Sequence, residues 1–175
     1  MTKEEKSVFD RPIVTEIEDI FHNTAKLHEA FSSDRSIKAL STVHEDMVKI
    51  CNKVVEVMNF SALEGARTTP TQQEYFRLGK SKLDGINKKS NHQIDEEQPL
   101  SLALDVAPYP IDFEDKSKAR ARFYMLAGHF FQVAHDLYEA GEISHKLRWG
   151  GDWDGDKIFD DQSFDDLPHF ELTKA

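Results

Sequence analysis

The chain has 175 residues, 39% of them hydrophobic, and a formal net charge of −10. This length and apolar content suit one domain with a core of its own and leave little room for a second. Nucleic-acid-binding domains normally present a basic face, so the acidic balance argues against DNA, RNA and anionic membrane surfaces as partners.

The single cysteine, Cys51, excludes an internal disulfide and a thiolate metal site. It lies among apolar residues at helical spacing, so we expect a buried thiol. The opening MTKEEKSVFDRP is charged and does not resemble a secretory signal, and no apolar run is long enough to span a bilayer. We therefore expect synthesis in a cytoplasm and no membrane span.

The first third of the chain predicts helices. Apolar residues recur at helical spacing over 13–31 and again over 37–58, and SSDRS separates the two runs. A short strand that ends at Gly65 follows. A helix is then expected over 70–78, with Thr69 as its cap, Pro70 in its first turn and an end at Gly79.

The remaining two thirds predict a small sheet. Residues 80–99 are polar and loop-like, whereas LSLALDVAP is typical of a buried strand. The clearest helix covers 117–140, and Gly141 ends it. KLRWGG and LPHFEL predict two further strands. The fold class is therefore α+β: N-terminal helices, then a small antiparallel sheet that carries the candidate site, with one helix crossing between strands.

Three segments hold the polar residues best placed for chemistry: Ser90-Asn91-His92, Asp105 after the apolar LSLAL, and the stretch from Asp166 to His169. A carboxylate at the end of a buried strand is costly unless a partner or a metal compensates it. Two histidines and one carboxylate suit catalytic zinc, because they leave a fourth position for water. From the residues alone, a hydrogen-bonded histidine on a strand and an aspartate in a turn remain the alternatives.

Metal-assisted hydrolysis also needs a base for the water proton and a donor for the developing oxyanion. Asp166, three residues before His169, is the candidate base, and Arg67 is the candidate donor. Histidines elsewhere are expected on the surface, namely His22, His28, His44 and His145.

The Asp-rich stretch 152–166 suggests a second cation. Four aspartates fall at positions 1, 3, 5 and 9 of a calcium-loop pattern; they are Asp152, Asp154, Asp156 and Asp160. The glycine is misplaced and no glutamate closes the loop, so a solvated acidic loop is the preferred interpretation over calcium binding.

Three blocks, in order, resemble the VanY/VanX-type zinc peptidases (the M15 superfamily), and most closely the phage L-alanyl-D-glutamate endopeptidases. They are EGARTTPTQQEYFRLGKSK, SNHQ…LSLALDVAPYPIDF and LRWGGDWDGD…FDDLPHFEL. The resemblance implies that zinc is bound by His92, Asp105 and His169, that Asp166 is the acid/base, and that Arg67 steadies the scissile carbonyl. One departure is that twelve residues separate His92 from Asp105, more than this family usually has.

The resemblance covers residues 37–172, so we expect an N-terminal helical extension over 1–36 and a peptidase domain over 37–175. It implies a phage endolysin that hydrolyses peptidoglycan stem peptides and reaches the cell wall only after another protein has permeabilised the membrane. We expect this protein to be a monomer. The alternative within the superfamily is a D-alanyl-D-alanine carboxypeptidase or dipeptidase. The alternative of another class is a non-catalytic, calcium-responsive acidic binding module.

Overall fold

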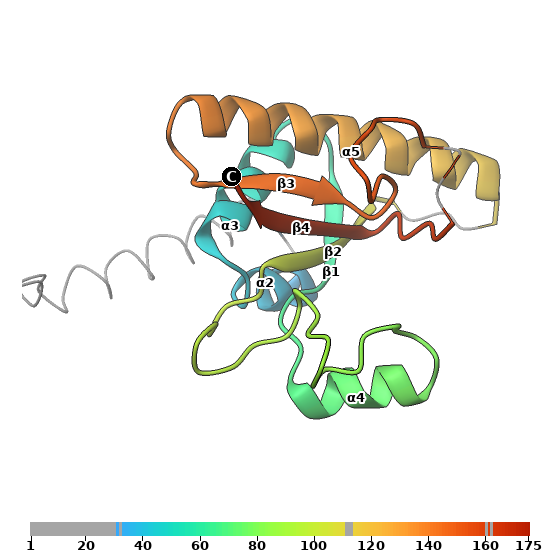
Figure 1. The fold of residues 1–175 in the computed structure, drawn as a ribbon. Helices are drawn as coiled ribbons and strands as arrows, with labels where there is room; N and C mark the ends of the chain where they lie inside the picture. Colours follow the sequence, from blue (N-terminus) through green and yellow to red (C-terminus); the bar gives the residue numbers. More distant parts are fainter. Residues whose placement is uncertain (1–30, 32, 111–113, 160, 162) are drawn as a thin grey trace, which may run out of the picture.

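The computed structural model describes residues 31, 33–110, 114–159, 161 and 163–175. Nearly all of the predicted helix over 13–31 lies outside the described residues, as do His22, His28 and Asp160. The elements follow in the order α2 (Asp34–Leu40), α3 (Glu45–Val54), β1 (Phe60–Glu64), α4 (Thr69–Arg77), β2 (Ala103–Pro108), α5 (Lys116–Glu139), β3 (His145–Trp149) and β4 (His169–Lys174) (Figure 1).

The four strands form one antiparallel sheet in the order β1-β2-β4-β3. The chain leaves β2, runs through α5 and returns on the far side of β4, so β4, the last strand, fills the centre. This arrangement places Asp105 of β2 directly opposite His169 of β4. The predicted α+β class with a small antiparallel sheet is confirmed.

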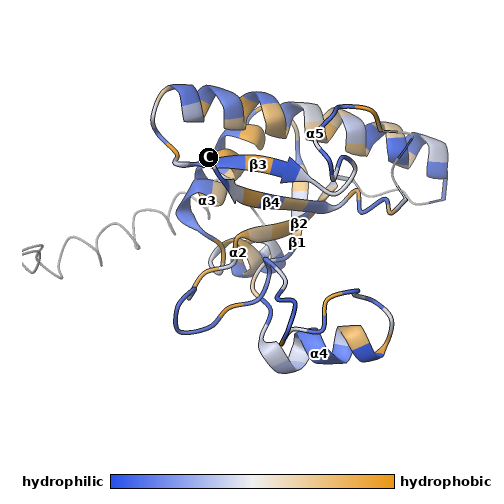
Figure 2. Ribbon diagram, viewed as in Figure 1, coloured by the Kyte–Doolittle hydropathy of each residue, from blue (hydrophilic) through white to orange (hydrophobic). Residues whose placement is uncertain are grey.

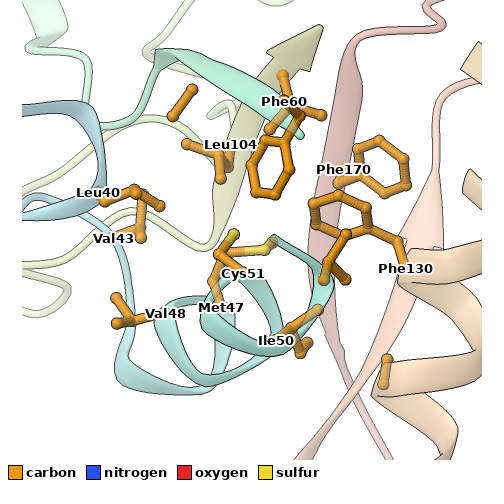
Figure 3. Packing of buried hydrophobic residues seen from close by; sticks show 14 of the residues in the cluster. Leu40, Val43, Met47, Val48, Ile50, Cys51, Phe60, Leu104, Phe130 and Phe170 are labelled. Carbon is orange, nitrogen blue, oxygen red and sulfur yellow. The ribbon is translucent and has the colours of Figure 1, made fainter. Parts of the chain in front are cut away.

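One face of the sheet packs against α3 and α5 to form the core. Leu104 and Val106 of β2 and Phe170 and Leu172 of β4 alternate onto this face and are fully or almost fully buried. Phe170 stacks on Phe130 of α5 with ring centroids 4.4 Å apart (Figure 3). Because side chains alternate along a strand, Asp105, His169 and Glu171 lie on the opposite face of the sheet, where they line a cleft.

The hydropathy pattern follows these layers. Figure 2 shows that β2 is largely apolar, whereas the edge strand β3 is largely hydrophilic. Cys51 of α3 is completely buried in the core, which confirms the expected buried thiol. Within the described part of the chain, no helix combines the length and the apolar character needed to cross a bilayer.

Two helix predictions were wrong in detail. The single helix expected over 37–58 is two helices, because residues 41–44 turn aside to pair with Ser101: His44 N donates to Ser101 O (2.8 Å) and Ser101 N to Thr42 O (2.9 Å). The second helical run also starts earlier than expected, since α2 begins at Asp34, within SSDRS. The proposed domain boundary at 36/37 falls inside α2 and stays a prediction.

The expected cap of α4 is displaced by one residue. Thr68, not Thr69, is the N-cap, and its side chain accepts from Thr71 N at 3.4 Å. Gln72 in the first turn of α4 is fully buried, and its Oε1 accepts a hydrogen bond from Arg67 Nη1.

Candidate metal centre and active site

Residues far apart in the sequence meet on the open face of the sheet. Asp105 and His169 are cross-strand neighbours, and a loop between α4 and β2 brings the third side chain beside them. We call this group the cleft cluster: His92, Asp105 and His169.

The three inward atoms of the cleft cluster form an equilateral triangle. His92 Nε2, His169 Nδ1 and Asp105 Oδ1 are each 3.2 Å from the other two. Ligands about 2.0–2.1 Å from a tetrahedral zinc ion stand roughly 3.3–3.4 Å apart. The donor set and its spacing therefore fit a zinc ion bound by three protein ligands.

The outer ring nitrogens explain why a cation is needed. His92 Nδ1 lies 2.7 Å from Gly65 O, and His169 Nε2 lies 3.0 Å from Glu171 Oε2, so these partners assign the ring protons to the outer nitrogens. Both inner nitrogens then present lone pairs to each other and to the Asp105 carboxylate. Three acceptors in mutual contact require a proton or a metal ion between them.

The pKa shifts of the cleft cluster also indicate that it needs a positive charge. Burial opposes charge on His169, but hydrogen bonds with Asp105 and Glu171 outweigh it and raise the pKa of His169 to about 9. Burial would raise the pKa of Asp105, yet its close contacts with the rings of His169 and His92 hold it well below its usual range. The cluster thus attracts positive charge strongly, as a metal site must.

The extra residues between His92 and Asp105 do not separate them. Residues 93–100 form a loop whose two ends are joined by a hydrogen bond from Leu102 N to Asn91 O (2.9 Å). Backbone bonds from Arg67 N to His92 O (2.7 Å) and from Ile94 N to Arg67 O (3.1 Å) fix the same segment to the end of β1. The loop over residues 93–100 therefore lies beside the site without moving His92 away from Asp105.

Two glycines permit close backbone packing around the cluster. A Cβ on Gly65 would lie 2.3 Å from Ala39 O, so a larger residue would displace the carbonyl that orients His92. A Cβ on Gly150 would lie 2.4 Å from Asp166 O and 3.1 Å from His169 Cβ. Gly150 thus lets the Asp166–His169 turn lie against β3, with Asp166 N bonded to Gly150 O at 2.9 Å.

Asp166 lies beside the cleft cluster in an environment that favours its protonated form. Burial, and then the charge of Asp105, raise the pKa of Asp166 above its ordinary value. A carboxyl group whose pKa moves toward neutrality can both accept and return a proton. This is the property that an acid/base residue requires.

Arg67 is buried and rigidly held in the same cleft. Its guanidinium bonds to Glu64 Oε2 at 2.5 Å and to Gln72 Oε1 at 2.8 Å, and it lies 4.5 Å from the centre of the Tyr75 ring. These contacts use three of its five N–H donors, because Nε also faces Glu64 Oε1 at 3.3 Å. The other two N–H donors have no hydrogen-bond partner among the described residues, so they can serve a substrate oxygen.

The cleft around these groups has a volume of about 680 Å³. Trp153 forms part of its wall, with its ring 5.3 Å from that of His169, and Phe164 stacks on Trp153 at 6.4 Å. A space of this size holds a short peptide rather than a metal ion alone.

Sequence reasoning missed Glu171, which contacts both His169 and Arg148. Arg148 Nε bonds to Glu171 Oε1 at 2.6 Å, and the two residues are register partners across β3 and β4. A signal existed, since Glu171 follows His169 by two and so shares its strand face. Glu171 fixes the ring orientation of His169, and Arg148 fixes Glu171.

The Asp-rich loop brings together three of the four aspartates that suggested calcium. Carboxylate oxygens of Asp152, Asp154 and Asp156 lie within 4.8 Å of one another, and Asp160 lies outside the described residues. Asp152 is buried and accepts from Gly155 N (3.0 Å) and Lys157 N (3.2 Å), so it already orders the loop. Calcium binding stays a prediction.

A second group of the same composition lies outside the cleft. We call it the helix cluster, because it joins the start of α3 to the start of β3: His44, Asp46 and His145. Both histidines were expected on the surface; they are partly exposed there, and each also contacts Asp46. Only the spacing of a histidine and an aspartate at a helix start hinted at it.

Comparisons with known proteins agree with this geometry. The sequence model of a family described as phage L-alanyl-D-glutamate peptidase matches residues 30–173. Among solved structures, the chain is similar to the L-Ala D-Glu endopeptidase ChiX of Serratia marcescens, with a TM-score of 0.55 and 26% sequence identity over 80% of this chain and 87% of that one. No curated protein sequence matches.

Proposed function

The chain belongs to the family of phage L-alanyl-D-glutamate peptidases, and from this premise we propose that it hydrolyses the L-alanyl-D-glutamate bond of peptidoglycan stem peptides with zinc held by His92, Asp105 and His169. The predicted family and the predicted peptidase activity are confirmed by the match. The observation that carries the zinc assignment is the triangle of two imidazole nitrogens and one carboxylate oxygen, each 3.2 Å from the other two.

When bound, zinc would supply Lewis-acid activation of a water molecule and of the scissile carbonyl. Asp166 takes the proton of the attacking water and delivers it to the leaving nitrogen, for which its raised pKa suits it. Arg67 directs its free N–H donors toward the carbonyl oxygen as negative charge develops there. Glu64 and Gln72 hold that guanidinium in place, so little reorganisation is needed during the reaction.

We further propose that the protein is a monomeric endolysin that reaches the cell wall after another protein has permeabilised the host membrane. The family description favours this over a D-alanyl-D-alanine carboxypeptidase or dipeptidase. A non-catalytic calcium-responsive module would give no reason for Asp166 and Arg67 to line the same cleft as the cleft cluster.

Mass spectrometry of digested peptidoglycan tests the bond that is cut. The proposal expects new N-terminal isoglutamyl ends that disappear after EDTA treatment and return with zinc but not with calcium. Release of free D-alanine instead would establish the carboxypeptidase alternative. Recovery with calcium alone would refute the zinc assignment.

A further inference from the structure

Two lysines in the active-site cleft form no ion pair with a described carboxylate, although the charge of Lys80 acts on Glu74 from beyond ion-pair distance. Five cationic side chains line the cleft, and three are paired: Arg67 with Glu64, Lys89 with Asp95 and Arg148 with Glu171. Within the described ranges, the other two, Lys80 and Lys82, form no ion pair, and both are exposed. Two lysines without ion pairs in one cleft are unexpected in a chain whose net charge is −10.

Aromatic rings hold both ammonium groups near the reacting centre. Lys80 Nζ lies 5.6 Å from the centre of the Tyr75 ring, which also carries the Arg67 guanidinium at 4.5 Å. Lys82 Nζ lies 4.8 Å from the centre of the Phe164 ring, which stacks on Trp153 beside the cleft cluster. A ring attracts an ammonium group without neutralising it, so both positive charges remain available to a ligand.

The backbone that carries the two lysines is tied to the catalytic arginine. Gln72 is completely buried, and its Oε1 accepts from Arg67 Nη1 at 2.8 Å. Its Nε2 donates to Ser81 Oγ at 2.9 Å and to Leu83 O at 2.6 Å. Since Ser81 lies between the lysines and its hydroxyl faces Gln72, one buried amide fixes the position of Arg67 and of the lysine-bearing loop together.

We propose that Lys80 and Lys82 form a carboxylate-binding rim that recognises the α-carboxylate of the D-glutamyl residue on the leaving side of the scissile bond. The inference rests on the proposed function. In an L-alanyl-D-glutamate unit, the leaving nitrogen and this carboxylate share one carbon atom, and the carboxylate is charged at neutral pH. The substrate is therefore anionic next to the bond that breaks, and the rim offsets its repulsion by an acidic protein.

Two matched peptide substrates test the rim. Both have the sequence L-Ala-γ-D-Glu-L-Lys with an acylated N-terminus and an amidated C-terminus; in one the glutamate α-carboxylate is free, and in the other it is a carboxamide. We expect the wild-type zinc enzyme to prefer the carboxylate substrate by about 10-fold or more in kcat/KM, the effect of one or two charge-assisted contacts. Most of this preference for the carboxylate substrate should come from a lower KM. The preference should become smaller as salt is added, because salt screens the attraction between the lysines and the carboxylate.

The double variant Lys80→Met/Lys82→Met should bring this preference close to one while leaving hydrolysis of the carboxamide substrate within about twofold of wild type. Lys88→Met is the matched control, because Lys88 is exposed on the same loop but does not line the cleft. It should keep the full preference. Thermal unfolding and zinc content, measured on all three proteins, exclude a folding defect.

The outcomes separate the two proposals. If the wild type cleaves neither these peptides nor peptidoglycan, the proposed function fails and the rim with it. If it cleaves both peptides and the double variant keeps the preference, or loses activity equally on both, the rim alone is overturned. A lysine effect seen only on a peptide with a free C-terminal carboxylate would place the contact on a later residue and contradict the assignment to glutamate.

Discussion

The cleft cluster and the helix cluster each contain two histidines and one aspartate, but their polar atoms are engaged differently. In the cleft cluster, the outer ring nitrogens bond to Gly65 O and Glu171, and the inner nitrogens and carboxylate meet at 3.2 Å. In the helix cluster, Asp46 Oδ2 already accepts from Ser144 N (2.9 Å) and His145 N (3.2 Å) and contacts His145 Nδ1 at 2.8 Å.

His44 is engaged too, since its Nδ1 accepts from Asp46 N at 3.1 Å as the N-cap of α3. A metal ion bound through His44 Nδ1 or Asp46 Oδ2 would have to displace that cap or the hydrogen bonds on Asp46. The comparison teaches that composition and proximity do not make a metal site. What matters is whether the inward lone pairs are left without donors by the surrounding protein.

The largest expected difference between the clusters is catalytic. Asp166→Asn, beside the cleft cluster, should lower kcat by about 10²–10⁴-fold with zinc content unchanged, because the amide cannot take up the water proton. Asp46→Asn, the same change in the helix cluster, should leave kcat within about twofold of wild type under conditions where the protein is folded. Turnover of a soluble muropeptide measures both. Equal kcat for Asp166→Asn and wild type would remove Asp166 from the mechanism.

For stability, we expect a substitution in the helix cluster to have a large effect. Asp46→Ala leaves the partly buried amides of Ser144 and His145 without their acceptor and removes a buried carboxylate, so we expect the free energy of unfolding to fall by about 2–3 kcal/mol. Urea unfolding of the zinc-free protein measures the change, with Asp136→Ala on the exposed side of α5 as the control. A loss of less than about 0.5 kcal/mol would mean that the helix cluster is not a structural tie.

Zinc affinity should depend on Glu171 through His169. Glu171→Gln keeps the size of the side chain but presents a neutral acceptor to His169 Nε2, and we expect zinc to bind about 10-fold more weakly. Competition with a chelator of known affinity measures this. His145→Gln, the matched loss of a contact in the helix cluster, should leave zinc affinity unchanged. Unchanged affinity in Glu171→Gln would mean that the ring is oriented by packing alone.

The smallest effect concerns pH and belongs to the helix cluster. Burial lowers the pKa of His44 below 6.5, and the negative charge of Asp46 offsets only part of this effect. The unfolded chain therefore binds more protons than the folded one in the window just below pH 6.5, and stability rises with pH there. His44→Asn keeps an N-cap but removes the titration. The free energy of unfolding should then vary less with pH in this window than in wild type or in a His135→Asn control.

Local pattern was enough to predict the strands that carry Asp105 and His169. The apolar run before Asp105 and the alternation around His169 indicate two strands, and the structure shows that these strands pair with the two residues opposite each other. Asp166 and Arg67 came from chemical need and from the family resemblance. Their roles, like that of the cleft cluster as zinc ligands, remain predictions.

The features that sequence reasoning missed depend on contacts between distant residues. Asp46 and Ser144 are 98 positions apart, and nothing near either residue signals the other. The break between α2 and α3 likewise arises from backbone pairing with Ser101, which helical periodicity cannot reveal. Glu171 is the exception, because its two-residue spacing from His169 was visible in the sequence.

Zinc stoichiometry in two matched variants tests the central claim most directly. His92→Ala removes one ring from the cleft cluster, and His145→Ala removes one ring from the helix cluster. Inductively coupled plasma mass spectrometry of the dialysed proteins should find about one zinc per chain in wild type and in His145→Ala, and almost none in His92→Ala. Stoichiometric zinc in His92→Ala, or its loss in His145→Ala, would contradict the assignment of the metal to the cleft cluster.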